Sequence, residues 1–171
     1  MTVYRLTTYG DPQPKGSMKC IGGRGPVKHQ LIEDDKTGAR KTWRSHLTAA
    51  AEALAQRLGE PLDGPVTVGA LFFLERPPSN RSFAPITRTS GDADKHLRMV
   101  LDCLTDAQVL VDDSRVVMPL AGKVWALDRR PGALVYVARS GPGIPGRILT
   151  AMLTEAPELE LRPTRTGALL P

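Results

Sequence analysis

The most constraining feature of this sequence is a nine-residue run, VTVGALFFL, at residues 66–74. Its β-branched and aromatic residues favour a strand, and Pro65, Pro77 and Pro78 limit it to the length of one. A strand that reads as a nearly continuous apolar run is buried on both faces, as happens where helices cover a sheet. The run therefore predicts a buried central strand in a domain that contains both helices and strands.

Two segments, one on each side of this run, have the spacing of amphipathic helices. Residues 42–58 and about 94–106 carry apolar side chains three and four positions apart, and Gly59 and Pro61 close the first segment. Asp92 or Asp94 stands where the N-cap of the second helix is expected. The predicted buried face of that helix consists of Leu97, Val100, Leu101 and Leu104.

Shorter segments complete the predicted sheet. Residues 3–9 alternate as a strand does, and residues 116–120, 123–127 and 133–138 have the composition of short strands. Residues 79–90 have the composition of an exposed loop, and after residue 139 glycine, proline and an acidic stretch replace the periodic pattern. The predicted fold class is α/β (α+β), with a mixed β-sheet packed by two main helices in a single domain of residues 1–139. We treat residues 140–171 as a C-terminal appendage with one short helix or partial disorder.

The bulk composition bounds the class of protein. A chain of 171 residues with 41% hydrophobic residues fits one domain, and a net charge of +5 suits a polyanionic partner. Cys20 and Cys103 lack metal-ligand spacing, and the three histidines have no zinc-binding pattern. No stretch approaches the roughly 20 apolar residues of a membrane span. We therefore expect a soluble, cytoplasmic protein without a zinc site.

Positive charge gathers between residues 15 and 44. These side chains either line a phosphate-binding surface or belong to a solvated loop, and the sequence does not say which of them would contact DNA. The basic residues of the segment are Lys15, Lys19, Arg24, Lys28, Lys36, Arg40, Lys41 and Arg44.

Two acidic segments carry the chemistry, GDADKHLR at residues 91–98 and LVDDSRVV at residues 110–117. Asp92 and Asp94 project to the same side of an extended backbone, and a fold that brings Asp112 and Asp113 alongside creates a cluster of carboxylates. Such a cluster needs a cation, and Mg²⁺ prefers carboxylate, water and phosphate oxygens. Arg98, one helical turn beyond Asp94, is placed to hydrogen-bond a phosphate oxygen.

A purely structural interpretation of the same residues stays open. Asp92 and Asp94 can cap the helix, and Asp112 and Asp113 can be turn residues. A ladder of charges four positions apart can form a salt-bridged solvent face. Spacing alone slightly favours this interpretation, because two aspartates separated by one residue are frequent in proteins. The ladder consists of Asp94, Arg98, Asp102 and Asp106.

The order of these segments resembles the RusA family of crossover junction endodeoxyribonucleases, which are Holliday junction resolvases. The order of motifs that this resemblance rests on begins with a strand, a P-x-P-K-G loop and a D-x-D-N-x-x-K segment, which opens a helix that carries a later Asp. A DD-x-x-V segment and a downstream Lys follow. The resemblance covers about residues 3–138. The matching residues are Pro12 to Gly16, Asp92 to Arg98 with Asp102, Asp112 to Val116, and Lys123.

The resemblance implies a structure-selective endonuclease of DNA recombination and repair that cuts four-way junctions by Mg²⁺-dependent hydrolysis, with Mn²⁺ as an alternative ion. It further implies a homodimer on branched DNA and favours a prophage or other mobile-element origin. The implied catalytic residues are Asp92, Asp94, Asp113 and Arg98. The implied metal ligands are Asp92, Asp94, Asp113 and Asp112. The implied DNA contacts are Lys15, Lys19, Lys95, Arg115 and Lys123.

The chain departs from the family pattern at two positions. Lys95 stands where the family has Asn, and Arg98 stands where it has a catalytic Lys. Arginine keeps the positive charge without the compact ammonium, so either side chain is a candidate for the catalytic cation. Two other functions remain open on the sequence, a non-catalytic branched-DNA-binding protein and a phage structural protein whose acids serve solubility.

Overall fold

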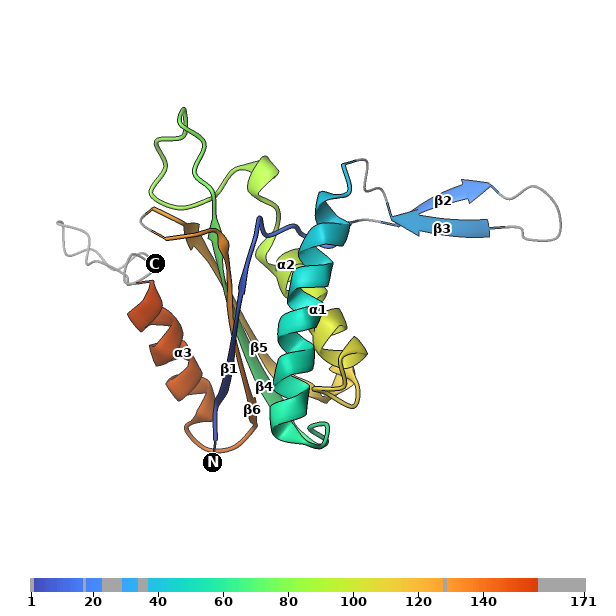
Figure 1. The fold of residues 1–171 in the computed structure, drawn as a ribbon. Helices are drawn as coiled ribbons and strands as arrows, with labels where there is room; N and C mark the ends of the chain where they lie inside the picture. The colour runs from blue at the N-terminus through green and yellow to red at the C-terminus, as the bar shows by residue number, and fades with distance from the viewer. Residues whose placement is uncertain (1, 17, 23–28, 34–36, 128, 157–171) are drawn as a thin grey trace, which may run out of the picture.

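The computed structural model describes residues 2–16, 18–22, 29–33, 37–127 and 129–156 (Figure 1). In chain order the elements are β1 (Tyr4–Tyr9), β2 (Met18–Gly22), β3 (His29–Glu33), α1 (Ala39–Leu58), β4 (Val66–Leu74), α2 (Ala93–Asp106), β5 (Val116–Trp125), β6 (Gly132–Arg139) and α3 (Ile144–Glu155). Two 3₁₀ turns, η1 (Arg88–Ser90) and η2 (Asp113–Arg115), precede α2 and β5.

The main sheet has four strands in the order β1-β6-β4-β5. β4 runs parallel to β5 and antiparallel to β6, while β1 runs antiparallel to β6, so the sheet is mixed. All nine residues of β4 are buried. The predicted central strand and the α/β (α+β) fold class are therefore confirmed.

The strand β5 corrects one prediction. Residues 116–120 and 123–127 do not form two short strands, because the backbone continues as one ten-residue strand through Ala121 and Gly122. Both residues keep their pairing with β4, opposite Ala70 and Leu71. Backbone hydrogen bonding to a buried neighbour thus outweighs the weak strand propensity of Ala and Gly.

Helices cover both faces of the sheet. Figure 1 shows α1 and α2 on one face and α3 on the other, and each side has its own hydrophobic cluster. α3 contributes Ile148 and Met152, which lie so close to β4 that a Cβ at Gly69 would collide with both. The segment set apart as an appendage therefore contains a third helix packed on the sheet, while residues 157–171 lie outside the described part.

A separate two-stranded antiparallel sheet, β2 with β3, occupies part of the region predicted to be a polar loop. The sequence predicts a loop after the first strand, and no strand, in this basic stretch, and that prediction is wrong, since Met18 pairs with Glu33 and Gly22 with His29. Lys19 lies in β2, but its side chain is outside the described ones, as are Arg24, Lys28 and Lys36. In the described part of the chain, no helix has the length and apolarity that crossing a membrane requires.

The helix α2 runs along the sheet from one end to the other. It begins near the carboxyl end of β5, where Lys123 contacts Ser90 and Gly91. After α2 the chain returns to the amino end of β4, where Leu110 pairs with Leu62. A helix of 14 residues is about 21 Å long. Residues just before α2 and residues well after it therefore lie at opposite ends of the domain.

Candidate active site

Asp92 and Asp94 open the helix α2 with their carboxylates in solvent. Asp92 is the N-cap residue in extended conformation, as predicted, but its side chain makes no capping hydrogen bond. It pairs instead with Lys95, at 2.9 Å between Nζ and Oδ2. The hydrogen bond and charge of Lys95, with a smaller contribution from Lys123, hold the pKa of the Asp92 carboxyl below its usual range. Both carboxylates are thus exposed and next to positive charge.

Lys123 braces the loop from which Asp92 projects. Its ammonium donates to the Ser90 hydroxyl at 3.0 Å and to the carbonyl of Gly91. Partial burial lowers the pKa of Lys123, and the charge of Asp92 opposes that shift. The sequence predicts Lys123 as a DNA contact, and the structure adds a role in fixing the acidic segment.

His96, in the core, contacts the same loop that precedes Asp92. The side chain is fully buried, its Nε2 donates to the carbonyl of Ser90 at 2.9 Å, and its ring lies 5.0 Å from that of Phe72. Its Nδ1 has no hydrogen-bond partner among the described residues. A Cβ at Gly91 would meet this ring, so glycine lets the loop pass close to it. Sequence spacing does not reveal this role, because only the fold brings Ser90 and Phe72 to the histidine.

The burial of His96 makes stability depend on pH. Desolvation lowers its pKa below 6.5, so on acidification the unfolded chain takes up a proton that the folded chain does not. We expect the free energy of unfolding to fall below about pH 6.5, by at most about 1.4 kcal/mol per pH unit. Urea denaturation from pH 7 to pH 5 measures this. The His96→Gln variant should lose this part of the slope, and equal slopes for both proteins would contradict the prediction.

The loop of residues 11–16 is tied to the helices. The backbone N–H of Lys15 donates to the carbonyl of Lys95 at 3.1 Å, and its ammonium pairs with Asp102. Arg40 Nε donates to the carbonyl of Pro14 at 2.9 Å. Lys15 therefore serves at least to anchor the loop on α2, and its predicted contact with DNA stays a prediction.

The charged residues spaced four apart on α2 do not pair with one another, as the structural interpretation supposed; two of them pair with α1 instead. Arg44, from α1, binds Asp106 at 2.5 Å and lies 3.9 Å from Asp102. Arg98 is exposed and makes no hydrogen bond or ion pair with the residues that the structure describes. Asp102 and Asp106, in the last turns of α2, thus form ion pairs with α1. Asp94 and Arg98, nearer the start of α2, are exposed to solvent.

The second acidic segment lies at the far end of α2. Asp112 caps the turn η2, accepting a hydrogen bond from Ser114 N at 2.9 Å, and this bonding lowers the pKa of Asp112. Arg115 pairs with Asp63 at 3.0 Å, and Asp113 is exposed. Across the described residues, no three His, Cys, Asp or Glu side chains gather as a metal site. One chain brings Asp92 and Asp94 together but does not bring Asp113 to them.

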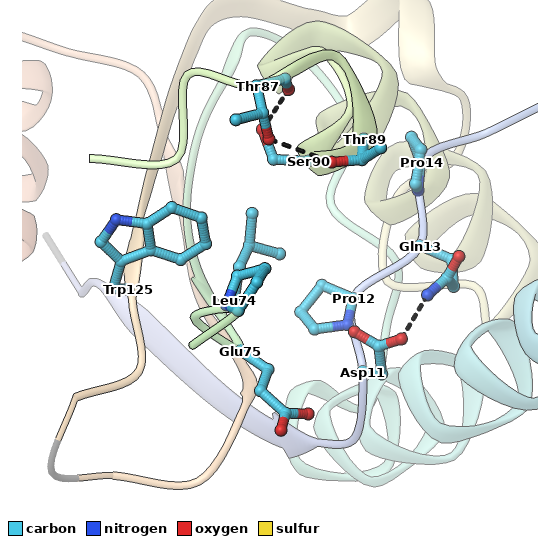
Figure 2. A pocket seen from close by; sticks show the side chains of 11 residues that line it. Asp11, Pro12, Gln13, Pro14, Leu74, Glu75, Thr87, Thr89, Ser90 and Trp125 are labelled. Carbon is cyan, nitrogen blue, oxygen red and sulfur yellow. Dashed lines mark hydrogen bonds between the residues drawn. The ribbon is translucent and has the colours of Figure 1, made fainter. Parts of the chain in front are cut away.

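A pocket of about 210 Å³ opens beside the acidic loop (Figure 2). Its wall combines the loop of residues 11–14, the end of β4 and the turn η1, with Trp125 on one side. Gln13 Nε2 donates a hydrogen bond to Asp11 Oδ2 at 2.5 Å. Burial raises the pKa of the Asp11 carboxyl. Ser90 belongs to this pocket and also to the support of Asp92, so the pocket and the acids share one loop.

Comparison with known proteins identifies the family. The family model of endodeoxyribonuclease RusA matches residues 12–137, a span that includes both acidic segments and Lys123. The helix α3 lies outside the match. No curated protein matches the chain. The match covers well over half of the sequence and agrees with the order of the motifs, so this chain belongs to the RusA family of endodeoxyribonucleases.

Proposed function

We propose that this protein resolves four-way DNA junctions, as a homodimer, by Mg²⁺-dependent hydrolysis of phosphodiester bonds. Membership of the family supports cutting of DNA. The observation that carries the finer proposal is the exposed pair Asp92 and Asp94 at the start of α2, beside Lys95 and Lys123. The amino end of a helix and the two ammonium groups favour an incoming phosphate.

The donor set fits a magnesium ion. Asp92 and Asp94 offer hard carboxylate oxygens in solvent, and such ions take one or two carboxylates together with water and substrate phosphate. When bound, Mg²⁺ lowers the pKa of a water and stabilises charge on the phosphoryl group. The Lys95 ammonium, which now pairs with Asp92, can bind a phosphate oxygen instead when the metal ion occupies the Asp92 carboxylate. Arg98 projects from the same helix, one turn on, where a guanidinium can hold a second phosphate oxygen.

A second copy of the chain is proposed to complete each site. Asp113 lies about one helix length from Asp92 in the same chain, so an Asp113 that joins the site comes from the partner. The neighbourhood of Asp113 suits a protein contact, because Val111, Val117 and Met118 are exposed there and β5 is an edge strand. A two-fold axis would create two equal sites, which matches the two symmetrical cuts that resolve a junction.

Incision of an end-labelled four-way junction tests the proposal, with Mg²⁺, Mn²⁺ or chelator and with a matched linear duplex. We expect paired, symmetrical nicks that require the metal ion and spare the duplex. Salt-sensitive binding without nicks under any divalent ion would favour the non-catalytic binding protein. Absence of salt-sensitive DNA affinity would favour the structural role.

A further inference from the structure

The loop between β4 and α2 exposes two large apolar side chains. Phe83 is 77% exposed and Ile86 is 74% exposed, more than any other large hydrophobic residue in the described part of the chain. They lie three positions apart on one loop, which ends at the acidic segment. Scattered apolar residues on a surface need no explanation, but two such side chains on one loop that leads into the acidic segment call for one.

The loop is braced, so this exposure belongs to a defined conformation. Trp125 Nε1 donates to the carbonyl of Ser82 at 3.0 Å, and the Ser90 hydroxyl donates to the carbonyl of Pro85 at 2.9 Å. Within the loop, Arg76 Nε donates to the carbonyl of Asn80 at 2.9 Å. The first bond ties the middle of the loop to β5, the second ties its last part to η1, and the third joins the beginning of the loop to its middle. Phe83 and Ile86 therefore stand on a preorganised support.

The charge of the loop indicates what covers these side chains. Residues 76–91 contain Arg76, Arg81 and Arg88 and no acidic residue. A second copy of the chain that placed its own loop against this one would add like charge, because the three arginines would face their counterparts. A polyanion reduces the repulsion instead, and each neutralised phosphate releases counterions. The loop also leads into Asp92, two residues after Ser90, so DNA whose phosphate reaches the proposed metal site would pass beside it.

We propose that Phe83 and Ile86 form a wedge that inserts between bases of branched DNA where the strands part, while the arginines contact the flanking phosphates. Apolar side chains that enter base steps unstack them and kink the duplex, and unstacking costs least where pairing is already interrupted. This inference rests on the proposed function for the choice of branched DNA. It assigns the loop a part in recognising the branch point, separate from the acids that cut.

The test uses a four-way junction with 2-aminopurine at its centre, in chelator, because the emission of that base rises when it unstacks. We expect the full-length protein to raise the emission severalfold and Phe83→Ser with Ile86→Ser to lose most of that rise. Binding of linear duplex should stay within about twofold, because the arginines remain. The matched control is Leu127→Ser with Leu149→Ser, two exposed apolar residues outside residues 76–91, and it should behave as the unmodified protein does.

Three outcomes would overturn the wedge. They are a full rise in emission with the Phe83 and Ile86 variant, no rise with the unmodified protein, or loss of a dimer by that variant in sedimentation. The last would assign the loop to a contact between copies. Since no cleavage is needed, this measurement is independent of the incision assay, whose failure would contradict the proposed function alone.

Discussion

The Asp94→Asn variant is expected to bind a four-way junction as well as the unmodified protein and to cut it about 1,000-fold more slowly. Asparagine keeps the size of the side chain and removes the negative charge that a metal ion requires. Asp94 is exposed and makes no hydrogen bond or ion pair with the described residues, so the fold should not change. Single-turnover incision with Mg²⁺, together with junction binding in chelator, measures the two effects separately.

The matched control for this variant is Glu52→Gln. Glu52 is an exposed carboxylate on α1, on a helix that holds none of the proposed ligands, and its loss removes the same charge. Both variants remove one negative charge, so any effect of net charge on DNA binding is the same in the two, and only a loss of cutting separates them. Cutting by Asp94→Asn at the rate of the control would eliminate Asp94 as a metal ligand.

Local sequence signals were sufficient for the central elements of the fold. The strand β4 coincides with the predicted residues 66–74, because prolines bound a run that no helix pattern competes with. The helix α2 begins one residue before the predicted start and ends at the predicted Asp106. Its buried face includes the predicted Leu97, Val100 and Leu104, and Leu101 is partly buried. Periodicity works here because each helix buries one stripe against a single sheet face.

The sequence allowed one short helix after residue 139, but it did not predict that this helix packs on the sheet, because that packing depends on tertiary contacts. The helix α3 follows a stretch rich in glycine and proline, which suggested a tail, although left-handed Gly143 and Pro145 in the first turn are themselves compatible with a helix start. What stabilises α3 is burial of Ile148 and Met152 over Gly69, a position about 80 residues earlier. Local composition carries no information about such a partner.

Of the candidate site, the sequence predicted the pair of adjacent carboxylates but not the residues that surround it. The adjacency of Asp92 and Asp94 follows from their spacing, but Lys123, His96 and Ser90 meet only through the fold. The expectation that Asp112 and Asp113 lie alongside Asp92 was not met within one chain. The predicted helix of residues 94–106 already contained the reason, since a helix of that length holds its two ends about 20 Å apart. A resemblance between motifs assigns roles to residues without saying which copy of a dimer supplies them.

Mixing two inactive variants should restore cutting if the dimer shares its sites. We expect Asp94→Asn and Asp113→Asn to be inactive alone and a mixture, after exchange of subunits, to recover incision. In a mixed dimer one site combines both substitutions, while the other combines the intact Asp94 of one chain with the intact Asp113 of its partner. Random exchange makes half of the dimers mixed, so about a quarter of the original sites are active. Incision of a labelled junction by equal amounts of the two variants measures this.

The product distinguishes a shared site from recovery by other routes. Each mixed dimer has one active site, so it should nick one strand of the junction and leave the symmetrical second cut unmade, which a denaturing gel separates from full resolution. If each site instead used Asp94 and Asp113 of the same chain, every subunit in the mixture would carry one substitution and no site would be intact. A mixture that stays inactive, although sedimentation of tagged chains shows exchange, would therefore require a rearrangement within one chain that brings the two ends of α2 together. The long helix and its packing on the sheet oppose such a rearrangement, because Met99, Val100 and Leu104 would have to leave the core.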